Sequence, residues 1–269
     1  MLTLSDKTQS ILYILLVMAG SAAVVALGWH QLLMFVPALT ALVMMLVIGR
    51  DGYTRDGWRR LGLGRAGVRR WPAALLLPAA ALGGGYLAAT AAGAAAPEPL
   101  PGAPGAARAL NYLLLVAFYT FTFSLGEEVG WRGYLLPRLM AFGHRRGHLI
   151  CGLAWAAFHY PVIFLSDLYR PDGNRLLGAG LFTLMVLPLS VVIGELRLRT
   201  DSLWVASLMH SAHNAFDEVV GSQVRMTAPL GPYLAGETGI VTLLIYLAAA
   251  LWLLHRSGRR TGRAARSAA

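Results

Sequence analysis

Long apolar runs follow one another along the whole chain, and short basic or Gly/Pro-rich segments separate them. Each run is close to the twenty or so residues that a helix needs to cross a bilayer. The eight runs are Ile11–Gly28, Leu32–Ile48, Trp71–Gly93, Ala109–Leu136, Leu149–Leu165, Leu176–Gly194, Leu203–Val220 and Ile240–Leu254. The pattern predicts an all-α, polytopic membrane protein with about eight transmembrane helices. We expect residues 1–269 to form a single integral membrane domain.

Composition supports this prediction. Hydrophobic residues make up 57% of the chain and charged residues 13%, whereas a soluble domain carries roughly a quarter charged residues. An ordinary soluble domain is therefore excluded, and so is a disordered chain, because apolar residues are abundant almost everywhere. The only cysteine, Cys151, excludes a disulfide scaffold and a multi-cysteine zinc site.

The formal net charge of +10 indicates topology rather than nucleic-acid binding, because the basic residues collect in alternate connecting segments. Lys7 and the arginines that follow the second, fourth, sixth and eighth runs number 18, and the opposite segments hold 4. Basic residues accumulate on the cytoplasmic side of a membrane. We therefore expect both termini in the cytoplasm of a cell whose plasma (inner) membrane holds the protein.

Three connecting segments have a distinct composition. Asp51–Arg70 interleaves aromatic and leucine residues with arginines, which fits equally a short amphipathic helix on the inner leaflet or a solvated basic loop. Ala94–Ala107 is rich in Ala, Gly and Pro and is expected to form an external loop. Arg256–Ala269 is expected to be disordered and held near anionic lipid by its charge.

Ionisable residues are rare inside the predicted spans, and those present are concentrated in three of them. A charged side chain at the centre of a membrane helix costs roughly 2.5–3.5 kcal/mol, so such residues are functional candidates. They are Glu127, Glu128 and Arg132 in the fourth span, His159 in the fifth, and His210, His213, Asn214, Asp217 and Glu218 in the seventh. This concentration predicts a polar site built by the fourth, fifth and seventh spans.

The candidate residues of these three spans share one depth. Glu127 lies eleven residues before Arg138, His159 eleven after His148, and His210 eleven after Arg199. At 1.5 Å per residue each is roughly 15 Å from the basic side. Polar residues that serve only packing have no reason to share one plane. A site at this depth needs water, so we expect it to open toward the cytoplasm.

Helical spacing suggests which groups pair. Glu128 and Arg132 are four residues apart and share a face, so they are expected to form an ion pair. Glu127 points about 100° away and is left without that partner, which suits a general base. His210 and Asn214 share a face in the same way, and Asp217 could orient His210.

Packing explanations exist for several of these groups. A single membrane histidine such as His159 is often a packing residue bonded to a neighbouring helix, and this is the favoured interpretation of His213. The Glu128–Arg132 pair fits an interhelical clamp. Trp131, Tyr134, Trp155 and Tyr160 are expected to be ordinary pocket or packing aromatics.

Three motifs in this region resemble those of the CPBP family, the CAAX proteases and bacteriocin-processing enzymes also called Abi. Residues 127–132 (EEVGWR) are similar to the family's EExxxR motif, and residues 210–214 (HSAHN) to its HxxxN motif. Residues 155–159 (WAAFH) are similar to its FxxxH motif, with Trp155 in place of the usual phenylalanine. The resemblance covers about residues 107–220, the expected catalytic core formed by spans four to seven.

The resemblance implies a glutamate-dependent intramembrane endopeptidase related to the type II CAAX prenyl endopeptidase. Carried over by motif, Glu127 is the base that activates water, and His159 assists it. His210 and Asn214 form the oxyanion hole, while Glu128 and Arg132 hold the orientation of Glu127. Peptide hydrolysis requires these parts: an activated water, donors for the oxyanion and a proton for the leaving amine.

Alternatives remain at this point. Glu127, His159 and His210 are also a possible catalytic zinc set, although a metal-free site with no cofactor is preferred because Glu127 cannot easily be both ligand and base. A non-catalytic immunity or regulatory partner protein could use the same pocket for binding. A proton-coupled transporter is the third possibility, but no broken-helix repeat supports it.

The expected partners are a peptide or membrane-protein substrate and the lipid bilayer, with no nucleic acid. One lysine against 22 arginines, with abundant Ala and Gly, indicates a bacterial genome of high GC content. Prenylated CAAX proteins are generally lacking in bacteria, so prenyl specificity is not carried over. The sequence does not indicate an oligomeric state.

Overall fold

The computed structural model describes residues 4–98, 105–166 and 174–267 and consists mainly of helices. Within these ranges, seven helical segments are long and apolar enough to cross a membrane. They are Asp6–Ala26, His30–Ile48, Val68–Ala91, Gly105–Phe142, His144–Leu165, Arg175–Thr200 and Ile240–Ser257. The predicted all-α polytopic membrane fold is confirmed.

Several of these segments consist of more than one element, whose bounds are as follows. The first half of the chain contains α1 (Asp6–Ala26), η1 (His30–Phe35), α2 (Val36–Val43), η2 (Met44–Ile48), η3 (Asp51–Tyr53), α3 (Arg55–Arg60), η4 (Val68–Arg70), α4 (Trp71–Ala91), β1 (Ala95–Pro97) and α5 (Gly105–Phe121). The centre contains α6 (Phe123–Glu128), η5 (Val129–Leu135), α7 (Leu136–Leu139), η6 (Met140–Phe142), α8 (His144–Phe158) and α9 (Tyr160–Leu165). The last part contains α10 (Arg175–Thr200), α11 (Leu203–Phe216), η7 (Asp217–Gly221), β2 (Val224–Met226), α12 (Gly231–Leu234) and α13 (Ile240–Ser267).

The run predicted as the seventh span, Leu203–Val220, forms α11 and the π-helical η7. It is not among the seven segments above, and α11 itself has only 14 residues. Nearly all of α11 is buried, and it packs against α4, α5, α6 and α10. Its polar residues therefore face other helices, where hydrogen-bonding groups at membrane depth are tolerated.

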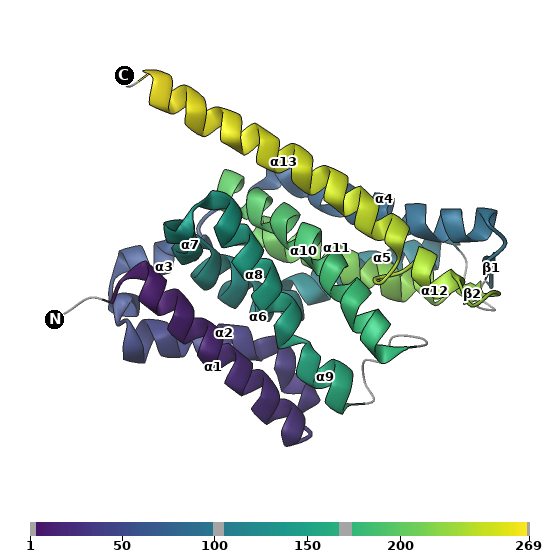
Figure 1. Cartoon of the computed structure of the whole chain (residues 1–269), viewed down its shortest axis with the longest axis horizontal. Helices are drawn as coiled ribbons and strands as arrows, with labels where there is room; N and C mark the ends of the chain where they lie inside the picture. The colour runs from purple at the N-terminus through teal and green to yellow at the C-terminus, as the bar shows by residue number, and fades with distance from the viewer. Residues whose placement is uncertain (1–3, 99–104, 167–173, 268–269) are drawn as a thin grey trace.

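The segments predicted to lie in the cytoplasm meet at one end of the bundle, which we call the basic end. Arg60 pairs with Asp6 at 3.1 Å, and Arg138 forms an ion pair with Asp51. Arg197 donates to the carbonyl oxygen of Arg60 at 2.8 Å. In Figure 1 this end carries α3, α7 and the C-terminal tip of α13.

The opposite end holds the short antiparallel pair β1–β2, with Ala96 opposite Arg225. Arg225 pairs with Glu98 at 3.0 Å, and Arg108 donates to Gln223 at 2.6 Å. Figure 1 shows β1, β2 and α12 at this end, far from α3 and α7. The two predicted sides of the membrane thus correspond to two ends of one bundle.

Two segments differ in structure from the sequence prediction. Asp51–Arg70 forms neither a continuous amphipathic helix nor an irregular loop, but the short elements η3, α3 and η4 joined by turns. Arg256–Ala269 was expected to be disordered; as far as Ser267 it continues α13 as helix, and Ala268 and Ala269 lie outside the described residues. The alanines and arginines of this tail are good helix formers, so they extend the helix that Ile240 begins.

Candidate active site

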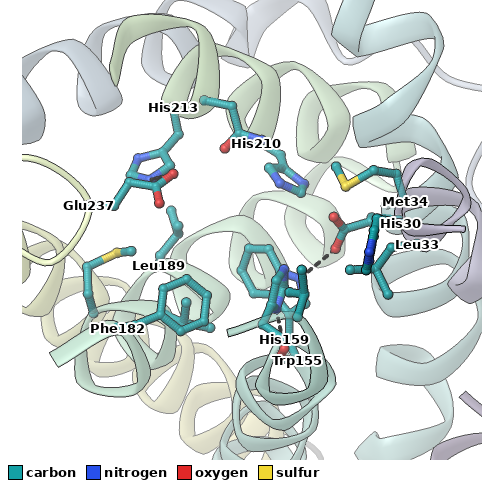
Figure 2. A pocket seen from close by; sticks show the side chains of 15 residues that line it. His30, Leu33, Met34, Trp155, His159, Phe182, Leu189, His210, His213 and Glu237 are labelled. Atoms are coloured by element: carbon teal, nitrogen blue, oxygen red, sulfur yellow. Dashed lines mark hydrogen bonds and ion pairs between the residues drawn. The ribbon is translucent and has the colours of Figure 1, made fainter. Parts of the chain in front are cut away.

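The four predicted catalytic residues line one cavity of about 290 Å³. Glu127 comes from α6, His159 from the junction of α8 and α9, and His210 and Asn214 from α11. In Figure 2, His159 and Trp155 lie on one wall of this cavity and His210 on another. The spans that the sequence predicted to form the site are therefore the ones that meet there.

The local backbone is irregular where it presents these side chains. The fourth span breaks at Thr122, whose φ of −127° and ψ of −96° are not helical, and α6 begins at the next residue. From Val129 the chain continues as the π-helix η5, a feature that is rare and often found at functional sites. Gly126 and Gly130 let this segment approach the first two spans closely. A Cβ on Gly126 would lie 2.7 Å from the carbonyl oxygen of Met34.

The fifth span is interrupted at His159. Pro161 occupies the first turn of α9, and proline has no N–H to continue the hydrogen bonds of α8. His159 consequently lies at a turn between two helices. Its half-buried imidazole reaches the cavity instead of packing in a continuous helix.

Glu127 is held by two indole groups. Trp155 Nε1 donates to Glu127 Oε2 at 2.7 Å, and Trp131 Nε1 donates to the same oxygen at 3.2 Å. Among the described residues no donor contacts Oε1. Both tryptophans were expected to be ordinary pocket or packing aromatics; Trp155 does line the pocket, and both also donate hydrogen bonds to Glu127. Trp131 is four residues after Glu127, so the spacing that pairs Glu128 with Arg132 also predicts this contact.

Glu128 forms the predicted ion pair with Arg132, at 2.7 Å and with neither side chain exposed. The same Glu128 oxygen also contacts His210 Nδ1 at 2.9 Å. The Arg132 guanidinium stacks 4.1 Å from the ring of Trp155. Glu128 and Arg132 therefore support two of the candidate catalytic groups, His210 directly and Glu127 through Trp155.

Asp217, which the sequence suggested could orient His210 indirectly, forms no hydrogen bond with it among the described residues. Its carboxylate accepts a hydrogen bond from the Tyr86 hydroxyl at 2.6 Å. Glu128, on a different helix, contacts His210 instead.

Hydrogen bonds at Nδ1 fix the tautomers of both candidate histidines. His159 Nδ1 lies 2.8 Å from the carbonyl oxygen of Trp155, which can only accept, so Nδ1 carries the proton. His210 Nδ1 donates to the Glu128 carboxylate in the same way. In the neutral rings each Nε2 therefore has a lone pair. His210 can donate from Nε2 only as the imidazolium ion, a condition that sequence reasoning did not foresee.

Three further polar groups line the cavity. His213, expected to be structural, contacts the Tyr246 hydroxyl through Nδ1 at 2.9 Å. His30 and Glu237 were not singled out from the sequence, because both lie in connecting segments outside the predicted spans. Figure 2 shows His30 and Glu237 on opposite sides of the cavity.

The candidate zinc ligands of this cavity do not converge on one point. Within the described part of the chain, three or more potential ligand atoms lie within 4.8 Å of one another only at His144, His148 and Glu195. Glu127, His159 and His210 do not meet that spacing, and His210 and Glu127 each have the hydrogen bonds described above. The three residues as arranged do not fit a shared metal ion.

The cavity lies toward the end of the bundle opposite the basic end. His30 lies in η1, which follows the far end of α1, and Glu237 lies in the segment between α12 and α13. On the basic-end side, Trp131, Arg132 and Tyr134 are each 0% exposed. The opening toward the cytoplasm that the sequence predicts stays a prediction.

Residues 109–216 match the family model described as "Type II CAAX prenyl endopeptidase Rce1-like". All three motifs lie within that range. No curated protein matches this sequence. The match supports a peptidase.

Proposed function

We propose that the chain is an intramembrane endopeptidase with Glu127 as its general base, and the match of residues 109–216 to the Rce1-like family model supports this proposal. The observation that carries the proposal is the meeting of Glu127, His159, His210 and Asn214 at one cavity. These residues come from three different spans and supply the groups that peptide hydrolysis needs.

Glu127 is suited to activate water. The two indoles occupy Oε2, and Oε1 is left to take a proton from a water molecule. His159 Nε2 has a lone pair that can accept the second hydrogen of that water, because Nδ1 is committed to the Trp155 carbonyl. The water is thereby aimed at the scissile carbonyl, and Glu127 later passes its proton to the leaving amine.

The oxyanion forms on the other side of the scissile carbon. The Asn214 amide can donate to it without a change of protonation. His210 donates from Nε2 when its ring is protonated, and the adjacent Glu128 carboxylate pairs with that charged ring. Arg132 neutralises the same carboxylate from the other side. No metal ion takes part in this scheme.

The substrate is a peptide segment of a membrane-associated protein, and the alternative is a non-catalytic immunity or regulatory protein that binds such a segment. We propose that the protein is bacterial and sits in the plasma membrane with its basic end and both termini in the cytoplasm.

The two functions differ in their response to Glu127→Gln. Glutamine keeps the size of the side chain and cannot act as a base. We expect it to abolish cleavage, visible by mass spectrometry as loss of the peptides that wild-type membranes release. Glu98→Gln, which removes only an exposed carboxylate paired with Arg225, is the matched control and should behave as wild type. If the peptide patterns of folded Glu127→Gln and wild type are identical, the protein is not a peptidase.

A further inference from the structure

A separate cluster at the basic end has the composition of a metal site. His144 and His148 are four residues apart on α8 and face Glu195 of α10. One ligand atom from each of the three lies within 4.8 Å of the others. Two imidazoles and a carboxylate are a known ligand set for Zn²⁺, with the fourth position open to water.

The contacts around Glu195 leave Oε1 facing the two histidines, while other side chains bind Oε2. Arg199 Nε and Ser257 Oγ contact Oε2 at 2.8 and 2.6 Å, and both histidine Nε2 atoms point to Oε1. His148 Nε2 lies 3.2 Å from that oxygen, close to the roughly 3.3 Å that separates two ligands of a tetrahedral zinc ion. His144 is 39% exposed, so water can reach the open position.

Glycine at position 194 is necessary for this arrangement. A Cβ there would lie 2.7 Å from His148 Cε1, so any other residue would displace the ring. We propose that His144, His148 and Glu195 bind one Zn²⁺ ion that joins α8 to α10. Through Ser257, which contacts Glu195, the same site is connected to α13.

Zinc content tests this proposal without reference to activity. Full-length protein in detergent is stripped with a chelator, titrated with Zn²⁺ alone by calorimetry, desalted and analysed for metal. We expect one equivalent per chain in wild type and in Glu127→Gln. We expect binding weakened about tenfold or more in His144→Ala, and lost in His148→Ala and Gly194→Ala. His255→Ala, which removes an exposed histidine of α13, is the control and should bind as wild type.

His144→Ala removes a half-exposed ring and keeps the buried part of the site, so it separates loss of a ligand from loss of the fold. The proposal fails if wild type binds no zinc, in which case the cluster is a hydrogen-bonded tie only. It also fails if one equivalent persists in the folded His144→Ala and His148→Ala proteins with unchanged affinity. Loss of zinc in Glu127→Gln would place the ion in the catalytic cavity and overturn it.

Discussion

Single side chains determine how the candidate base is held. Trp155 stands where the related motif has phenylalanine, and its indole donates to Glu127 at 2.7 Å. The residue at position 155 therefore affects Glu127 through a hydrogen bond and not only through packing. The sequence revealed the departure, and the i, i+4 rule predicted the Glu128–Arg132 pair correctly. It could not show that Trp155 reaches Glu127 from another helix, because contacts between helices depend on their relative rotation.

Trp155→Phe tests this contact. Phenylalanine retains an aromatic ring beside Arg132 but cannot donate to Glu127. We expect kcat/KM for peptide cleavage to fall about 10–100-fold, the usual cost of losing a group that orients a functional residue. Trp204→Phe is the control, because Trp204 donates to the Leu63 carbonyl at the basic end. An unchanged rate in Trp155→Phe would show that the hydrogen bond has no part in positioning the base.

Whole helices were the most predictable part of the structure. Apolar runs identified the helices of the bundle, and Pro161 marks the break at His159. The break at Thr122 and the π-helix after Glu128 were not predicted, because apolarity is the same for α- and π-helical turns. These irregularities turn Glu127 and its neighbours toward the cavity. Close contacts between helices at Gly126 and Gly130 stabilise the irregular backbone. The sequence does not reveal these contacts, because the residues that meet are far apart along the chain.

Gly130→Ala tests one of these close contacts. The added Cβ would lie 2.2 Å from the Tyr13 hydroxyl oxygen and 2.5 Å from Pro37 Cβ, so η5 would be forced away from α1 and α2. We expect a loss of about 1–3 kcal/mol in stability, measured by thermal unfolding in detergent. Gly180→Ala on α10 has open space around its Cβ and should be neutral or slightly stabilising. Equal stability of the two variants would contradict the packing argument.

At the scale of the whole molecule, the two ends of the bundle differ in charge and in how they are closed. Ion pairs join segments of the basic end that are distant in sequence. Arg138 is the most buried arginine in these pairs, with 1% of its side chain exposed. The sequence predicted which segments share that end. It did not predict that arginines counted as cytoplasmic markers would be buried there, because burial depends on partners contributed by other segments.

Asp51→Asn measures the contribution of this tie. The substitution leaves the buried Arg138 cation with only the more distant Asp6 carboxylate, at 4.0 Å, and loss of a buried pair costs up to about 3–5 kcal/mol. Asp56→Asn is the matched control in the same region: its pair with Arg59 is 78–80% exposed and should contribute about 0–1 kcal/mol. Chemical unfolding of the two variants in detergent gives the comparison. A smaller loss in Asp51→Asn than in Asp56→Asn would mean that Arg138 is satisfied without Asp51.

The neighbouring acids Glu127 and Glu128 are stabilised in opposite ways, the first by uncharged indoles and the second by a buried cation. Neutralising Glu128 leaves the buried Arg132 without the carboxylate that pairs with it. The amide oxygen of a glutamine at position 127, in contrast, can still accept hydrogen bonds from both tryptophans. Glu127→Gln can therefore remove the peptidase activity and leave the pocket folded. The Glu127→Gln protein should retain its natural ligand uncut, and it can serve as a substrate trap for crosslinking in living cells.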